Sequence, residues 1–134
     1  MSIIVFTNGC FDILHDGHLS LLKECRSYGD RLIVGLNSDS SVKILKGEKR
    51  PIFGQEFRKR HLLDLRYVDE VIIFEEDTPL KLLRKITPHF FVKGGDYTNP
   101  VGFDFVRSYG GEVVIIPDLT GLSTSKIIEK VKNL

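Results

Sequence analysis

The sequence predicts an α/β fold in which a five-stranded parallel sheet lies between two layers of helices. Five short runs of apolar, largely β-branched residues recur along the 134-residue chain, and each run is continuous rather than alternating. Strands that are buried on both faces have this pattern, and they are typical of parallel sheets. Amphipathic helical patterns separate the runs, so strand and helix alternate along the chain. The prediction is a three-layer sandwich with right-handed crossovers.

The elements are expected in a regular order. The strands are predicted at 3–6, 32–36, 71–74, 90–92 and 113–116. Apolar residues at helical spacing predict helices around 19–25, 57–65 and 80–86, with a closing helix at about 124–131. Gly29 follows the first of these helices, and Pro79 stands at the expected first position of the third. Polar, glycine-flanked stretches predict loops at 47–54 and 94–102.

Composition and charge exclude several classes of protein. With 134 residues, of which 42% are hydrophobic, folding removes roughly two-thirds of the accessible surface of the unfolded chain. We therefore expect a single domain over 1–134. The 19 basic and 18 acidic residues give a net charge of +1, so we expect no nucleic-acid or membrane partner. Two cysteines, no basic leader and no apolar run of ~18 residues predict a cytoplasmic protein.

The residues that follow the strands are the candidate site, because an open parallel sheet binds ligands beyond the carboxyl ends of its strands. The first strand leads through 8–18 into a helix, and Gly9 and Gly17 let a ligand approach the backbone there. A helix start favours an anion. His15 and His18 are three residues apart, so both can donate to one ligand oxygen as it gains charge. Alternatively they cap or pack, or bind zinc with Cys10.

Basic and hydroxyl side chains follow the later strands. Lys43, Lys46, Lys49, Arg50, Arg58 and Lys59 cluster after the second strand. They form either a solvated helix face or a set of charges that neutralises a polyanionic substrate. After the fourth strand, 93–96 reads Lys-Gly-Gly-Asp, which is either an ordinary turn or a close approach to a ligand. Three hydroxyls at 123–125 open the closing helix, where a cap needs one, so a second anion site is an alternative to a cap.

Taken together, these segments resemble a known superfamily. His15-Asp16-Gly17-His18 matches the H-x-G-H signature of the cytidylyltransferase-like nucleotidyltransferases, and 122–127 resembles their second signature, I-S-T-T-x-I. The resemblance covers essentially the whole chain and implies a Rossmann-like sheet. Within the superfamily, the chain is most similar to the adenylyltransferase domain of ADP-heptose synthases at 7–15, 37–39, 45–47, 74–79 and 92–97. The resemblance implies transfer of AMP from ATP to a sugar 1-phosphate, with Mg²⁺ accompanying the triphosphate and no metal held by the protein.

The resemblance also implies a role for each site residue. The catalytic residues would be His15, His18, Lys46 and Arg58. The nucleotide would be bound by Cys10, Phe11, His15, His18, Gly94, Asp96, Leu122, Ser123, Thr124 and Ser125. The sugar phosphate would be bound by Asp12, Lys46 and Lys93. Lys46 and Arg58 would neutralise charge between the two substrates, and no side chain would act as a nucleophile.

Two other functions stay open. The chain also resembles glycerol-3-phosphate cytidylyltransferase at 66–71 and 103–105, although Asp118 follows Pro117 where that enzyme usually has an arginine. A noncatalytic nucleotide-binding module would carry the same histidines and hydroxyls. The families that the chain resembles commonly form homodimers, so a homodimer is implied. They often include a fused kinase, which 134 residues cannot hold, so a separate kinase is expected.

Overall fold

The computed structural model describes residues 2–95 and 98–117, and these form a five-stranded parallel sheet with helices on both faces. The strands are β1 Ile4–Gly9, β2 Arg31–Asn37, β3 Glu70–Phe74, β4 Phe90–Gly94 and β5 Glu112–Ile116. The helices are α1 Asp16–Ser27, α2 Asp39–Lys46, α3 Gln55–Leu63, α4 Leu80–Ile86 and α5 Phe103–Ser108. The predicted fold class is confirmed. The closing helix expected at 124–131 lies outside the described residues.

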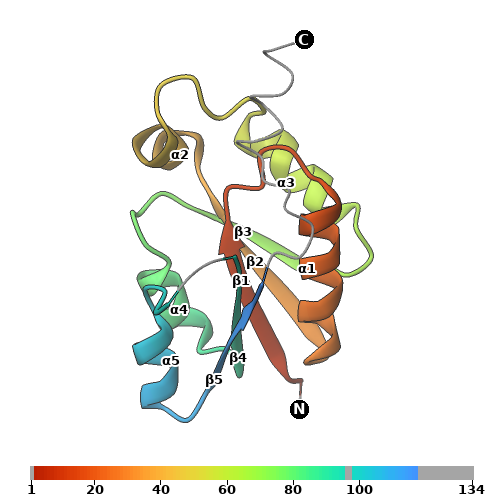
Figure 1. The fold of residues 1–134 in the computed structure, drawn as a ribbon, viewed down its shortest axis with the longest axis vertical. Helices are drawn as coiled ribbons and strands as arrows, with labels where there is room; N and C mark the ends of the chain where they lie inside the picture. The colour runs from red at the N-terminus through yellow and green to blue at the C-terminus, as the bar shows by residue number, and fades with distance from the viewer. Residues whose placement is uncertain (1, 96–97, 118–134) are drawn as a thin grey trace.

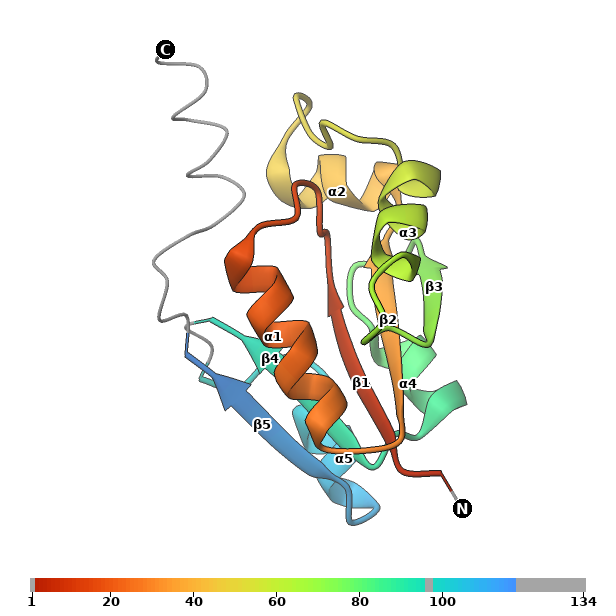
Figure 2. The same ribbon diagram turned by 90° about the vertical axis from the view of Figure 1, so that its right-hand side faces the viewer.

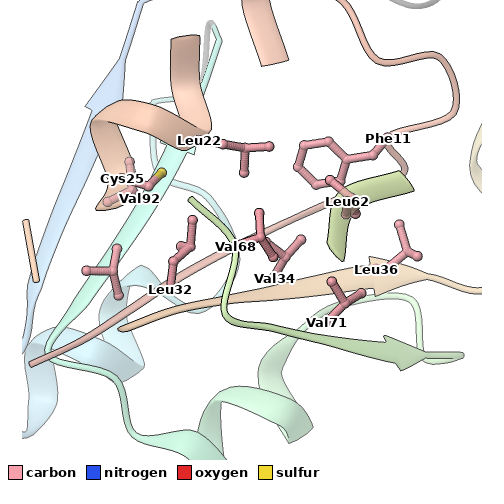
Figure 3. Packing of buried hydrophobic residues seen from close by; sticks show 11 residues of the cluster. Phe11, Leu22, Cys25, Leu32, Val34, Leu36, Leu62, Val68, Val71 and Val92 are labelled. Carbon is pink, nitrogen blue, oxygen red and sulfur yellow. The ribbon is translucent and has the colours of Figure 1, made fainter. Parts of the chain in front are cut away.

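The helices pack in two layers, one on each face of the sheet. α1 and α3 cover one face, and α4 and α5 cover the other (Figure 1). On the first face, Leu22 and Cys25 of α1 and Leu62 of α3 pack on the sheet in a cluster of buried side chains (Figure 3). On the second face, a separate cluster joins α4 and α5 to Phe6 and Phe91. The strands are therefore apolar on both faces, which explains their continuous hydrophobic runs.

The connections between strands differ in detail from the sequence prediction. Two helices, α2 and α3, lie between β2 and β3, and the pattern expected at 57–65 corresponds to α3. Ser38 caps α2, because its side chain accepts a hydrogen bond from the backbone N–H of Ser41. Pro79 is the N-cap of α4 rather than its first helical residue, since the helix begins at Leu80. No helix within 2–95 or 98–117 is long and apolar enough to cross a membrane.

The order of the strands places the reversal of chain direction at the middle of the sheet. The order is β3-β2-β1-β4-β5, so the chain moves outward from β1 through β2 to β3 and then returns to the other side of β1. The carboxyl ends of β1 and β4 therefore flank the topological switch point, where parallel α/β sheets bind ligands. α2 and the segment after β1 lie at this same end of the molecule (Figure 2).

The strands part at the switch point. β1 pairs with β2 along its full length, from Ile4↔Arg31 to Gly9↔Leu36. β1 pairs with β4 at two positions, Val5↔Phe90 and Phe6↔Phe91, and no further pair between these strands is formed within the described part of the chain. The second half of β1 thus has a backbone ladder on one side. We call this region, beyond Phe6 in β1 and Phe91 in β4, the β1–β4 split.

Candidate active site

The first helix begins at the two histidines, and the structure brings their rings together. His15 is the N-cap of α1, and its Nδ1 accepts a hydrogen bond from the Gly17 N–H at 3.1 Å. A ring nitrogen that accepts carries no hydrogen, so neutral His15 holds its hydrogen on Nε2. The rings of His15 and His18 stack with centroids 3.8 Å apart and 22° between their planes. Nδ1 of His15 therefore caps the helix, and both rings occupy one location at its start.

The turn at 8–11 is anchored by an aromatic ring. Phe11 has a φ of 44°, in the left-handed region where a bulky residue is rare. Its side chain is buried in the cluster beneath α1 (Figure 3). It also meets the ring of His18 edge-on, with centroids 5.1 Å apart. A Cβ at Gly9 would lie 3.0 Å from the Phe11 ring, so the glycine allows this close packing. The Phe11 ring therefore packs against His18. The nucleotide contact expected for Phe11 would then come from its backbone.

Positive charges surround this turn at Cys10. Burial raises the pKa of the Cys10 thiol above its ordinary value of 9.0. Four cationic side chains act in the opposite direction and lower that pKa, namely Lys46, Arg58, Arg50 and Lys93. Because such an effect requires proximity, charges from distant parts of the sequence lie within electrostatic reach of one turn. Four positive charges therefore act on the segment at 8–11, of which Arg50 and Arg58 are paired with Asp12 and Asp39, and cations near such a turn favour a polyphosphate.

Arg58 is buried beneath the turn and not exposed between two substrates as the sequence suggested. Its side chain is 1% exposed. It donates hydrogen bonds of 2.8 to 2.9 Å to the carbonyl oxygens of Phe53, Cys10 and Asn37 and to Oδ1 of Asp39. Arg58 therefore joins the ends of β1 and β2 to the loop at 47–54. This arrangement favours a positioning role over the direct neutralisation of substrate charge.

Asp12 is also engaged within the protein. Its buried carboxylate accepts hydrogen bonds from Nε of Arg50 at 2.9 Å and from the backbone N–H groups of Ile52 and Phe53 at 2.7 and 2.9 Å. These contacts fasten the loop at 47–54 to the start of the β1–α1 connection. They differ from the substrate contact expected for Asp12, because both carboxylate oxygens already accept hydrogen bonds from this loop.

Two lysines expected at the site lie in different surroundings. Lys46 is exposed at the end of α2, yet its charge acts on both Cys10 and Lys93. Lys93 is partly buried near the end of β4, and its Nζ donates to the carbonyl oxygen of Asn8 at 2.9 Å. Desolvation lowers the pKa of Lys93 from 10.5 to about 8. A Cβ at Gly94 would lie 3.0 Å from the Leu21 side chain, so this glycine admits helix α1.

Several contacts of the site were not found from the sequence, although Arg50 itself was among the cations expected after the second strand. Arg50 and Asp39 complete the ion pairs with Asp12 and Arg58, at separations of 38 and 19 residues that no local pattern reveals. Thr7 Oγ1 and Asn8 Oδ1 are buried at the β1–β4 split and have no hydrogen-bond partner among the residues that the structure describes. Two polar residues at the end of a buried strand were the available signal. Predicted site residues outside the described part are Asp96, Leu122, Ser123, Thr124 and Ser125.

The described residues do not build a cage for a metal ion. Within 2–95 and 98–117, no group of three or more His, Cys, Asp or Glu side chains is arranged to hold one. Asp12, a carboxylate of the connection that precedes the histidines, is bound to the loop at 47–54.

Comparison with known proteins agrees with this geometry. The model of the family described as "Cytidylyltransferase-like" matches residues 6–130. The chain belongs to the cytidylyltransferase-like family. Its enzyme class is that of a nucleotidyltransferase, as the H-x-G-H motif predicted. The stacked pair of His15 and His18, which belongs to that motif, lies at the switch point of the sheet.

The chain is similar to part of larger proteins and to the whole of a smaller one. It is 54% identical over 130 residues to the bifunctional protein HldE of Pelobacter propionicus and 53% identical to that of Geobacter sulfurreducens. These matches cover 96% of this chain but 27% and 26% of the two relatives. A lipopolysaccharide core biosynthesis protein from Thermoplasma volcanium is 30% identical with a TM-score of 0.72, over 88% of this chain and 97% of that one. A pantoate-beta-alanine ligase from Francisella tularensis shares the fold alone, at 16% identity and a TM-score of 0.58, over 99% of this chain and 71% of that one.

Proposed function

We propose that this chain transfers AMP from ATP to D-glycero-β-D-manno-heptose 1-phosphate, giving ADP-heptose and pyrophosphate. The observation that carries the reaction is the pair of stacked imidazoles at the N-terminus of α1, beside a turn on which the charges of four cationic side chains act. The sugar follows from the resemblance to ADP-heptose synthases and agrees with the HldE relatives and with a relative named for lipopolysaccharide core biosynthesis.

The chemistry follows from the charges of the two substrates. A phosphate oxygen of the sugar 1-phosphate attacks the α-phosphorus of ATP, and the bond to the β-phosphate oxygen breaks as pyrophosphate leaves in line. Both substrates are anions that repel each other, so the protein's task is to hold them together and to stabilise developing charge. A nucleophilic side chain is not required.

The imidazoles supply hydrogen-bond donors for that charge. The hydrogen bond from the Gly17 N–H to Nδ1 of His15 sets the tautomer of the His15 ring. The Nε2–H of His15 is therefore in place as a donor before ATP binds. His18 is held against His15 and Phe11 by ring contacts. A donor of this kind stabilises a transition state by about 2–4 kcal/mol. Lys46 and the buried guanidinium of Arg58 add positive potential at the turn.

A substrate screen tests the proposal. The purified chain is incubated with Mg²⁺, each of ATP, CTP, GTP and UTP, and either heptose 1-phosphate or glycerol 3-phosphate, and pyrophosphate release is measured. We expect the fastest release with ATP and heptose 1-phosphate. Release with CTP and glycerol 3-phosphate alone would support the cytidylyltransferase alternative. No release from any pair would overturn the proposal.

A histidine substitution separates catalysis from simple binding. His18→Ala should lower kcat about 100-fold or more, corresponding to roughly 3 kcal/mol, with a modest change in ATP affinity. His61→Ala is the matched control, because His61 is exposed on α3 and packs against Phe57. If His18→Ala changes affinity alone, the chain is a nucleotide-binding module.

The implied partners are tested separately. Sedimentation equilibrium at assay concentration tests the homodimer that the resemblance implies. The larger relatives have a second activity, as their bifunctional name states, and this chain spans about a quarter of their length. We therefore propose that the heptose 1-phosphate is supplied by a kinase reaction outside the described domain.

A further inference from the structure

We propose that Lys93 is a positioning residue for the nucleotide, which bridges the β1–β4 split and holds the turn at 8–11 beneath the phosphates. The inference deepens the proposed function and rests on it, because it assigns a role to a side chain in the binding of ATP. Lys93 acts through Asn8, whose carbonyl oxygen it contacts, and not through a bond to the reacting atoms.

The first argument is geometric. The backbone ladder between β1 and β4 ends at Phe6↔Phe91, while the outer ladders continue to Gly9↔Leu36 and Gly94↔Ile116. Asn8 lies two residues beyond the last β1–β4 pair, and Lys93 lies two residues beyond it on the other strand. The bond from Nζ of Lys93 to the carbonyl oxygen of Asn8, at 2.9 Å, therefore crosses the split. At this position a side-chain hydrogen bond joins β1 to β4, as backbone pairing does at Val5↔Phe90 and Phe6↔Phe91.

The second argument is electrostatic. Lys93 brings a positive charge beneath the turn, and Lys46 brings another from the end of α2. The charge of Lys46 lowers the pKa of Lys93, so the two repel each other. An anion bound at the turn relieves this repulsion and favours the charged form of Lys93. Binding of a triphosphate should therefore raise the pKa of Lys93 and draw a proton to it.

The groups around Lys93 indicate that proton uptake near pH 8 can be assigned to its side chain. Among the residues that the structure describes, the groups that act on its pKa include Lys46, which lowers it, and the thiols of Cys10 and Cys25, which would raise it if ionised. Burial raises the pKa of Cys25 to about 12 and that of Cys10 above 9.0, so both thiols are neutral near pH 8. Proton uptake close to pH 8 therefore reports on Lys93.

The test compares nucleotide affinity at two pH values in four proteins. Isothermal titration calorimetry with the Mg²⁺ complex of a non-hydrolysable ATP analogue is carried out at pH 7 and pH 9. The proteins are the wild type, Lys93→Met, Lys93→Arg and the control Lys85→Met, in which an exposed lysine of α4 is changed. Circular dichroism confirms that each variant is folded.

The expected profiles differ between the variants. The wild type and K85M should bind about 10-fold more weakly at pH 9 than at pH 7, because Lys93 must first regain its proton. K93M should bind at least 10-fold more weakly than the wild type at pH 7 and show no further loss at pH 9. K93R should keep its affinity at both pH values, since arginine stays charged. A K93M protein with the affinity and pH profile of the wild type would overturn the inference.

A measurement on the wild type alone keeps the inference falsifiable if the variants do not fold. The heat of binding at pH 8.5 in two buffers with different ionisation enthalpies gives the number of protons taken up. We expect an uptake of about three-quarters of a proton per nucleotide at pH 8.5 and almost none at pH 6.5. Binding without proton uptake at pH 8.5 refutes the role of Lys93 while the proposed function stands. If the wild type neither binds nor turns over ATP, the function and the inference both fail.

Discussion

Replacing Arg58 by methionine should destabilise the protein by about 3–5 kcal/mol, because it removes the donor to three carbonyl oxygens; the Asp39 side chain is 42% exposed, so it is not left as a buried charge. Methionine keeps much of the volume of the side chain and removes its donors. Arg58 is 1% exposed and donates to three carbonyl oxygens and to Asp39. A carbonyl that loses a donor and stays buried costs about 1–3 kcal/mol. These costs do not add, because the loops can relax toward water. The expected loss of unfolding free energy is therefore smaller than the sum of the separate costs.

Lysine at the same position gives an intermediate case. Its single ammonium group cannot reach four acceptors that lie on three separate segments, whereas the planar guanidinium of Arg58 contacts all of them. We expect Arg58→Lys to destabilise the protein by about half as much as Arg58→Met. Arg60→Met is the control, because Arg60 is exposed on the same helix and should change stability by about 0.5 kcal/mol or less.

Urea unfolding measured by circular dichroism at 25 °C gives the free energies, with the m-values compared to check that the unfolding transition is unchanged. Pyrophosphate release from ATP is measured on the same samples in the absence of urea. If Arg58 is a positioning residue, the loss of stability and the loss of activity should appear together. An Arg58→Met protein as stable as Arg60→Met but inactive would show that the guanidinium acts directly on the substrates, which refutes the reasoning.

Three further outcomes are expected. Asp12→Asn sets an amide N–H₂ against donors and should lower the unfolding free energy by about 2–3 kcal/mol; a melting temperature equal to that of the wild type would contradict the contacts with Arg50 and the loop. Cys25, with its pKa near 12, should resist alkylation at pH 8 in the native protein, while Cys10 should react slowly and be protected by ATP, as mass spectrometry of the modified peptides can show. The pKa of Lys93 is about 8 in the folded state and 10.5 in the unfolded state, so the unfolded state binds more protons between these values. The unfolding free energy of the wild type relative to Lys93→Met should therefore rise by up to about 3 kcal/mol from pH 8 to 10.5 in urea titrations. A constant difference would contradict the shift.

Much of the fold could be predicted from the sequence, because the relevant signals are local. A continuous apolar run reports that both faces of a strand are buried, and Ser38 reports the start of a helix before any tertiary contact is known. The order of the strands could not be predicted in this way, because right-handed crossovers determine which face each helix covers and not which strands are neighbours. α5 was implied by the alternation of strands and helices, since its six residues are too few for a clear periodicity.

The site could be predicted in part. His15 and His18 are close in sequence and meet in the structure, because a helix start brings positions three apart together. The partners of Arg58 and Asp12 could not be predicted, because those contacts span 19 to 48 residues and depend on how the loop at 47–54 folds back. The sequence shows that a residue is charged but not whether its charge faces solvent or carbonyl oxygens. For Arg58 that distinction decides whether the residue neutralises substrate charge, as the resemblance implies, or positions the turn, as its contacts favour.

The hydrogen bonds that hold the turn at 8–11 differ in kind from those that hold the first half of β1. Up to Phe6, β1 is fixed by backbone ladders on both sides, which depend on strand geometry and hardly on the identity of the side chains. Beyond Phe6, the side toward β4 is fixed by Lys93, and the turn is fixed from below by Arg58. These ties are charged, so they place positive potential at the same atoms that they position. The proposed nucleotide site therefore lies where the backbone pairing of β1 and β4 ends. Side chains that replace backbone hydrogen bonds there can also attract a triphosphate.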